Sequence, residues 1–181
     1  ELEVGNAKQR MDTVSRIIQA PLSTADTYIQ MLEESWPVDQ DSRIAMQALL
    51  WPAQHPVRSS GEGQEKMSPV SQVDWLHALV SIEESDWKTA LDEIKKKKGL
   101  RLSHLDSLPS FASLPSFASL RAKLLFRVAL LRALGEFGTQ GNRQVVKPLF
   151  DFAFLYQGFF KEECGRILQQ IGEYAVPELT K

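Results

Sequence analysis

Residue types that carry catalytic or metal chemistry are sparse in this sequence and stand far apart. The three histidines, His55, His77 and His104, are isolated, and none belongs to a paired-histidine helix of the kind that binds catalytic zinc. Ser103 and Asp106 flank His104 in the chain, but nucleophilic triads assemble from distant segments, and the sequence has no Gly-x-Ser-x-Gly elbow. We therefore predict a protein that is not an enzyme, with no catalytic residue, no metal site and no cofactor.

Cys164 is the only cysteine, so the chain forms no internal disulfide. Glu162 and Glu163 precede it directly, and neighbouring negative charge raises the pKa of a thiol. An activated nucleophile requires the opposite shift. We interpret Cys164 as a small residue of the core.

The charge balance argues against a dedicated nucleic-acid protein. The 21 basic and 23 acidic residues give a formal net charge of -2, whereas phosphate recognition requires a concentrated basic surface. No window holds about 18 uninterrupted apolar residues, so we expect no membrane span. The sequence begins at Glu1 rather than at methionine, which predicts an upstream segment. No signal assigns a compartment, and we favour the cytoplasm.

Three amphipathic helices are predicted near the N-terminus. Apolar residues recur at three- and four-residue steps over 3–19, and prolines and capping residues bound two further helices over 24–36 and 39–50. Residues 1–51 are therefore predicted to form an N-terminal helical unit. The run 52–70, rich in Pro, Gly and Ser, is predicted to be a linker.

Residues 71–104 predict a helical hairpin. Its second helix ends in four lysines, Lys95 to Lys98, followed by Gly99. Lysines in a last turn favour the negative end of the helix dipole, and glycine suits a left-handed cap. The alternative is a lysine patch for acidic partners. The spacing over 71–99 also resembles a single tetratricopeptide repeat, although the Leu-Gly pair and the trailing proline of that family are missing.

Residues 105–119 contain a short duplication, Leu-Pro-Ser-Phe-Ala-Ser at 108–113 and again at 114–119. Its two prolines exclude a regular helix through this stretch. We interpret it as a connector whose Leu and Phe residues pack against neighbouring helices. The alternative is a proline-containing recognition peptide.

Residues 120–181 contain a longer repeat. The segment Arg132 to Gly138 aligns with Arg166 to Gly172 at an offset of 34 residues. A Val-x-x-Leu helix start with an early proline follows each copy, at 146–149 and at 176–179. An ordered combination at a fixed spacing is typical of helical repeat proteins.

This order of elements resembles the HEAT family, in particular its short-repeat, PBS-lyase-type members. The resemblance implies an all-α fold in which helical hairpins stack as a HEAT-like α-solenoid, here with an N-terminal helical unit, because one repeat cannot bury its own apolar stripe. Gln169 replaces the first glycine of the second copy, and a convergent pair of hairpins is the alternative. The last helix is short, so we expect repeats to continue beyond Lys181.

The predicted helix from Leu149 to Phe160 is apolar nearly all round. One stripe is explained by packing within the repeat, but Phe150, Phe154 and Leu155 lie outside that stripe. We favour burial of these side chains by the N-terminal helices or the connector. If they are exposed instead, they are the candidate partner-binding residues, because such a patch is rare on a monomer.

These features predict a non-catalytic scaffold or adaptor that binds another protein. One alternative comes from the HEAT resemblance: an enzyme or enzyme-associated module that is DNA glycosylase-like or bilin lyase-like. A strongly positive concave face would favour the glycosylase version. The other alternative is a homo-oligomeric structural helical domain, which a mass measurement in solution would identify.

Overall fold

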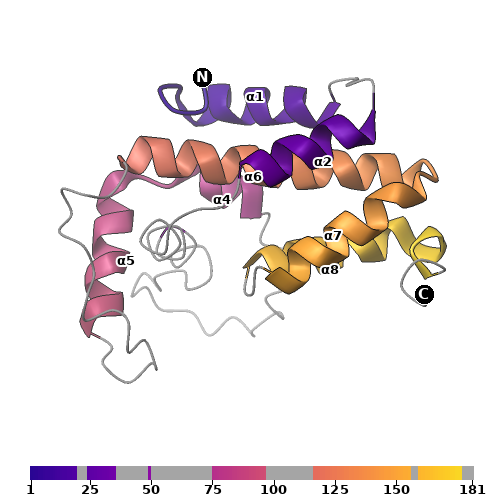
Figure 1. The fold of residues 1–181 in the computed structure, drawn as a ribbon. Coiled ribbons are helices and arrows are strands. Elements are labelled where there is room, and N and C mark those ends of the chain that lie inside the picture. Colours follow the sequence, from indigo (N-terminus) through magenta and orange to yellow (C-terminus); the bar gives the residue numbers. More distant parts are fainter. Residues whose placement is uncertain (20–23, 36–48, 50–74, 97–115, 156–158, 177–181) are drawn as a thin grey trace, which may run out of the picture. The chain divides into compact units, whose positions relative to one another are not determined.

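The computed structural model describes residues 1–19, 24–35, 49, 75–96, 116–155 and 159–176. Within these residues all regular structure is helical, which confirms the all-α prediction for this part of the chain (Figure 1). The chain forms two compact units. Unit 1 comprises Glu1–Met11 and Val38–Leu124, and unit 2 comprises Asp12–Pro37 and Leu125–Lys181.

Helix α1 (Ala7–Gln19) begins at a reciprocal pair of capping hydrogen bonds. The Gln9 N–H donates to Asn6 Oδ1 at 3.0 Å, and the Asn6 N–H donates to Gln9 Oε1 at 2.9 Å. Such a box satisfies backbone N–H groups that a helix start otherwise leaves unpaired. The helix therefore starts at Ala7, later than the predicted start at Glu3.

Unit 1 contains α4 (Trp75–Ser81) and α5 (Glu84–Lys96), in the region of the predicted hairpin. The short turn between them is fixed by Asp86, whose Oδ2 accepts the Glu83 N–H at 3.2 Å. Trp87 of α5 is buried and its ring centroid lies 5.6 Å from that of Phe117. This ring contact joins α5 to the start of α6.

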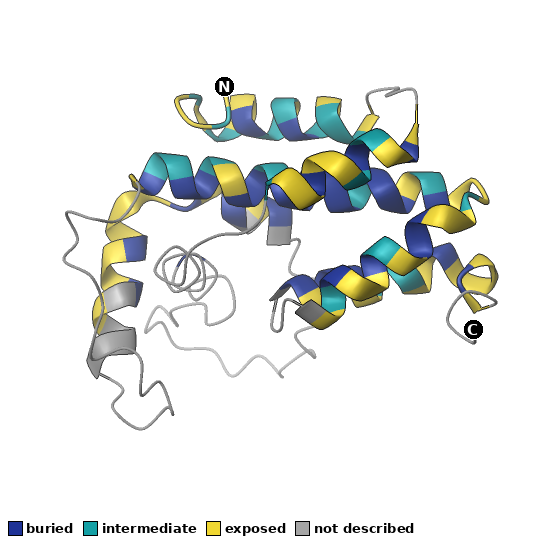
Figure 2. Ribbon diagram, viewed as in Figure 1, coloured by how far each residue is buried: buried dark blue, intermediate teal, exposed yellow. Residues whose placement is uncertain are grey.

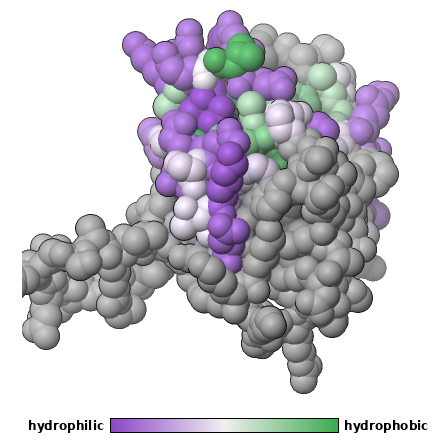
Figure 3. All heavy atoms as spheres, turned by 90° about the vertical axis from the view of Figure 1, so that its left-hand side faces the viewer, coloured by the Kyte–Doolittle hydropathy of each residue, from purple (hydrophilic) through white to green (hydrophobic). Residues whose placement is uncertain are grey.

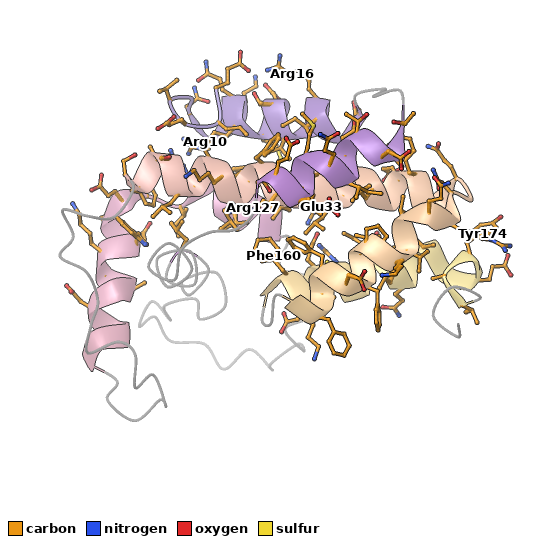
Figure 4. All side chains as sticks on the ribbon, in the orientation of Figure 1. Arg10, Arg16, Glu33, Arg127, Phe160 and Tyr174 are labelled. Atoms are coloured by element: carbon orange, nitrogen blue, oxygen red, sulfur yellow. The ribbon has the colours of Figure 1, made fainter. Side chains whose placement is uncertain are left out.

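Two buried arginines bind backbone carbonyls at the end of α4. Arg10, labelled in Figure 4, donates to the Val80 carbonyl from two nitrogens, with Nε at 2.8 Å. Arg121 donates to the Ile82 carbonyl at 3.0 Å and lies over the Phe117 ring, 4.9 Å from its centroid. Positive groups at a helix C-terminus are favoured by the helix dipole. Both side chains therefore have a structural role in unit 1.

Helix α6 (Phe117–Thr139) has 23 residues and is buried along most of its length (Figure 2). Ser116 Oγ accepts the Ser119 N–H at 3.2 Å and so caps the first turn. The helix consequently starts at Phe117, inside the segment 105–119 that was predicted to be a connector. Gly141, with a φ of +89°, follows its last turn.

In unit 2, α7 (Val146–Leu155) packs along α8 (Phe159–Ile171). The Phe152 and Phe160 rings meet edge to face, with centroids 5.5 Å apart and planes at 86°. The prediction of one continuous helix from Leu149 to Phe160 is therefore wrong. Residues eight positions apart on a single helix lie roughly 12 Å apart along its axis, too far for this ring contact.

Helices α6 and α8 approach closely at two glycines. A Cβ on Gly135 would lie 2.8 Å from Ile167 Cγ2, and a Cβ on Gly138 would lie 2.4 Å from Ile171 Cδ1. Both glycines lie inside α6. Their missing side chains leave room for isoleucines of α8. The two segments related by the 34-residue offset thus lie against each other.

Helix α2 (Ala25–Glu34) completes the core of unit 2 from the N-terminal part of the chain. Tyr28 is fully buried, and its ring centroid lies 5.5 Å from that of Phe137 in α6. Arg127 of α6 donates to the backbone carbonyl and to the hydroxyl of Ser35, at the C-terminal end of α2. Two short 3-10 helices, η3 (Arg143–Val145) and η4 (Gly172–Tyr174), follow α6 and α8.

Several predicted segments lie outside the described residues. They include the linker 52–70, most of the connector 105–119 and the chain beyond residue 176. Of the predicted third helix over 39–50, the structure describes only Leu49, which is helical and buried. The predictions for these segments stay predictions.

Candidate functional site

Three residues were singled out in the sequence analysis, Phe150, Phe154 and Leu155. Helix α7 exposes the two phenylalanines among them. Phe150 is 41% exposed and Phe154 is 75% exposed. Their ring centroids lie 5.4 Å apart with planes at 45°, as expected for residues one helical turn apart. We call these two residues the aromatic pair. Leu155 ends α7, and its side chain lies outside the described part of the structure.

The favoured expectation, that the core would cover this pair, is not what the structure shows. Helix α7 buries its opposite side instead, where Leu149 is fully buried and Phe152 is 6% exposed. Leu149 and Phe150 are one position apart, and Phe152 and Phe154 are two positions apart, so on a helix the members of each pair point toward different faces. The aromatic pair is therefore left at the surface.

The aromatic pair has an ion pair beside it on α7. Lys147 Nζ binds Asp151 Oδ2, and both side chains are more than half exposed. An exposed pair at i,i+4 contributes about 0–1 kcal/mol, so it adds solubility and orientation more than stability. On the face shown in Figure 3, hydrophilic residues predominate among the described ones. Exposed apolar side chains that lie next to each other often mark interaction sites on monomeric proteins.

A second feature is a buried carboxylate held by two arginines. Glu163 of α8 has a side chain that is 1% exposed. Its Oε1 accepts from Arg132 Nε of α6 at 2.8 Å, and its Oε2 accepts from Arg166 on the next turn of α8. We call these three residues the ion-pair cluster. It ties α8 to α6 close to the Gly135–Ile167 approach.

The ion-pair cluster lines a cavity of about 270 Å³ in unit 2, which we call the α6–α8 cavity. Its apolar lining comes from Ile18 of α1, Gly135 of α6 and Ile167 of α8, and its charged lining includes Arg132, Glu163 and Arg166. The cavity therefore combines aliphatic surface with guanidinium donors.

Sequence reasoning did not select the ion-pair cluster. One sequence feature pointed to it, because Arg132 and Arg166 occupy equivalent positions of the 34-residue repeat. Nothing local showed that both arginines would bind one glutamate, since Arg132 lies 31 positions from Glu163. Only the packing of α6 on α8 brings them together.

Cys164 and His77 are the two residues among the catalytic candidates weighed above that the structure describes. Cys164 is fully buried, and burial, with the charge of Glu163 next to it, raises the pKa of its thiol to about 12. The prediction that this cysteine lies in the core with a raised pKa is confirmed. His77 is exposed on α4, while His55 and His104 lie outside the described residues.

Two further features of the described part of the chain concern metal binding and membrane insertion. There, no three His, Cys, Asp or Glu side chains gather in a way that could hold a metal ion. No helix among the described residues is long and apolar enough to cross a bilayer.

Comparison with known proteins adds no relative. No family model, no curated protein and no solved structure matches this chain. The functional interpretation therefore depends on the aromatic pair and the α6–α8 cavity themselves.

Proposed function

We propose that this protein is a non-catalytic helical scaffold that binds another protein through α7. The observation that carries the proposal is the aromatic pair, Phe150 and Phe154, on the exposed side of that helix. Aromatic residues are enriched in the centres of protein interfaces, where they supply large apolar area at a small entropic cost.

The energetics favour a bound partner. Burying a phenylalanine side chain completely is worth about 1.5–3 kcal/mol relative to leaving it in water. Most of that gain is not realised for Phe154, which is 75% exposed. A partner that covers the aromatic pair would gain this free energy of burial. The ion pair of Lys147 and Asp151 would then lie at the polar rim of the contact.

We further propose that α6 to α8 form HEAT-like solenoid repeats. The close approach of Gly135 and Gly138 to Ile167 and Ile171 supports this part of the proposal, because it joins equivalent ends of the two sequence repeats. Solenoids present extended surfaces to partners, and each repeat buries its stripe against the next.

The test is the substitution Phe154→Glu. We expect the variant to lose captured partner while keeping the thermal midpoint of the unsubstituted protein, because a charge on an exposed position disturbs binding and not the core. Affinity capture from a lysate, with quantification of what co-purifies, measures the first effect. Thermal unfolding followed by circular dichroism measures the second.

The matched control is Val4→Glu, which replaces another exposed apolar residue, 88% exposed, by the same charge. It should leave capture intact. Unchanged capture by Phe154→Glu, or a large fall in its thermal midpoint, would contradict the proposed surface. If the captured protein is a second copy of this chain, light scattering will show a dimer that Phe154→Glu dissociates.

A further inference from the structure

The ion-pair cluster places two guanidinium groups beside one buried carboxylate. Two guanidinium groups, from Arg132 and Arg166, share the single buried carboxylate of Glu163. Arginine stays protonated in proteins, so the cluster carries a net charge of about +1 when Glu163 is ionised. This excess charge faces a cavity and not bulk water alone.

The remaining charged group in the cavity lining is Glu136 of α6. Glu136 is exposed, and solvent screens exposed charges much more than buried ones. Glu136 therefore lowers the positive potential only in part.

Arg166 is the residue best placed to receive a ligand. Its side chain is 40% exposed, and its bond to Glu163 uses one terminal nitrogen. A guanidinium has five N–H donors in a planar fork, so donors remain at the cavity after Glu163 is bound. Glu163 meanwhile fixes the plane of the fork and thus lowers the entropic cost of a second contact.

The rest of the lining is uncharged and includes both aliphatic residues and the polar residues Thr139 and Gln170. Ile18 and Ile167 provide apolar side chains, and Gly135 provides backbone without a side chain. The volume of about 270 Å³ lies just below the roughly 300–1,000 Å³ of pockets that hold drug-sized ligands. A ligand of this cavity is therefore small, with one polar end and one apolar end.

We infer that the α6–α8 cavity binds a small aliphatic monocarboxylate. Its carboxylate accepts hydrogen bonds from the Arg166 guanidinium, and its carbon chain lies against Ile18 and Ile167. This binding site is separate from the aromatic pair, so it adds a small-molecule function to the proposed scaffold and does not depend on it.

The experiment uses butyrate as the probe, with isothermal titration calorimetry at low ionic strength. Butyramide has the same shape without the charge, and we expect it to bind at least about tenfold more weakly, since charge-assisted hydrogen bonds are roughly twice as strong as neutral ones. Inorganic phosphate should also bind more weakly. Equal affinity for phosphate and butyrate would show a nonspecific anion effect and overturn the assignment to a carboxylate.

Variants locate the site. Arg166→Gln should reduce the affinity for butyrate by about tenfold or more. Arg143→Gln removes the same charge from an exposed position on η3, outside the cavity lining, and should leave the affinity unchanged. Equal losses in both variants, or no loss in Arg166→Gln, would overturn the inference.

A second variant avoids the ion-pair cluster and so does not depend on its stability. Glu136→Gln removes the rim carboxylate and should strengthen butyrate binding by about two- to fivefold, because a repulsive charge is lost. Unchanged or weaker binding by this variant would contradict the electrostatic basis of the site. Because Phe150 and Phe154 are not altered, partner capture should be unaffected by any of these substitutions.

Discussion

Cys164 shows how a residue's surroundings decide its chemistry. It lies in α8 directly after Glu163 and is fully buried. Burial in low dielectric disfavours the thiolate, and the adjacent carboxylate disfavours it further, so the pKa of the thiol rises from 9.0 to about 12. The thiol therefore stays protonated in the folded protein at neutral pH, which makes it a packing residue.

This raised pKa makes stability depend on pH in the alkaline range. Above about pH 9 the unfolded chain releases the thiol proton and the folded chain does not, so unfolding becomes more favourable as the pH rises toward 12. The contribution is fully present below pH 9 and is lost as the pH approaches the folded pKa. Each pH unit in this window is worth about 1.4 kcal/mol.

We expect urea midpoints to fall more steeply between pH 9 and 10.5 for the unsubstituted protein than for Cys164→Ala. The alanine variant has a lower urea midpoint at every pH because of the cavity that the substitution creates. The test compares only how steeply the midpoint falls with pH in the two proteins. Tyrosines and lysines titrate in both proteins and cancel in the comparison. Parallel curves would show that Cys164 ionises equally in the folded and unfolded states.

At the scale of elements, the contact between α6 and α8 depends on two positions of α6 that have no side chain. A glycine in a helix interior costs about 1 kcal/mol relative to alanine, and α6 contains two, Gly135 and Gly138. The close approach of Ile167 and Ile171 to these positions explains why glycine occupies them despite this cost. The glycines let the helices lie close together, and the isoleucines fill the space.

This packing predicts opposite effects for two similar substitutions. Gly138→Ala should lower the free energy of unfolding by about 1 kcal/mol or more, because overpacking costs of about 1–3 kcal/mol exceed the gain in helix propensity. A Cβ there would lie 2.4 and 2.6 Å from two Ile171 atoms and 3.1 Å from buried Val145. Chemical denaturation of the whole chain measures the change.

The matched control is Gly165→Ala in α8. A Cβ at that position meets nothing within 4 Å, so the substitution should stabilise the protein by about 0.5–1 kcal/mol through helix propensity alone. If both alanine variants stabilise the protein, the α6–α8 contact is looser than the structure shows. If both destabilise it, the glycines act through backbone conformation instead of through space.

At the scale of the whole molecule, the chain does not fold in simple sequence order. Unit 2 combines residues 12–37 with residues 125–181. Arg127 and Ser35, which are hydrogen-bonded, lie 92 positions apart. The buried Tyr28 meets Phe137 in the same unit. The C-terminal helices of unit 2 therefore rely on α2 to cover their core.

We expect the fragment 117–181 to lack a fixed tertiary structure when it is expressed alone. Without α2, the surface that Tyr28 covers is exposed and Arg127 loses its acceptors at Ser35, so the remaining core is too small for cooperative folding. Near-ultraviolet circular dichroism and the sharpness of thermal unfolding measure this. The full chain is the positive control.

Adding a peptide of residues 1–37 to this fragment should restore a cooperative transition, because it supplies the missing helix in trans. Cooperative unfolding of 117–181 without the peptide would contradict this prediction. It would indicate that the last helices form an independent domain.

Much of the local structure followed from the sequence by itself. The periodicity of apolar residues and the positions of prolines predicted that the described elements are helices, and Glu163 next to Cys164 contributes to the raised pKa of the thiol, although burial is the larger cause. These features depend on residues within a few positions of one another. Helix starts were less accurate at Ala7 and Phe117, because side-chain caps decided them.

The tertiary structure alone decided which surfaces are covered. It turned Phe150 and Phe154 outward, placed isoleucines of α8 against the glycines of α6, and brought Arg132 to Glu163. Such contacts join residues whose separation along the chain exceeds the reach of any local pattern, and their energies depend on burial that exists only after the helices have packed.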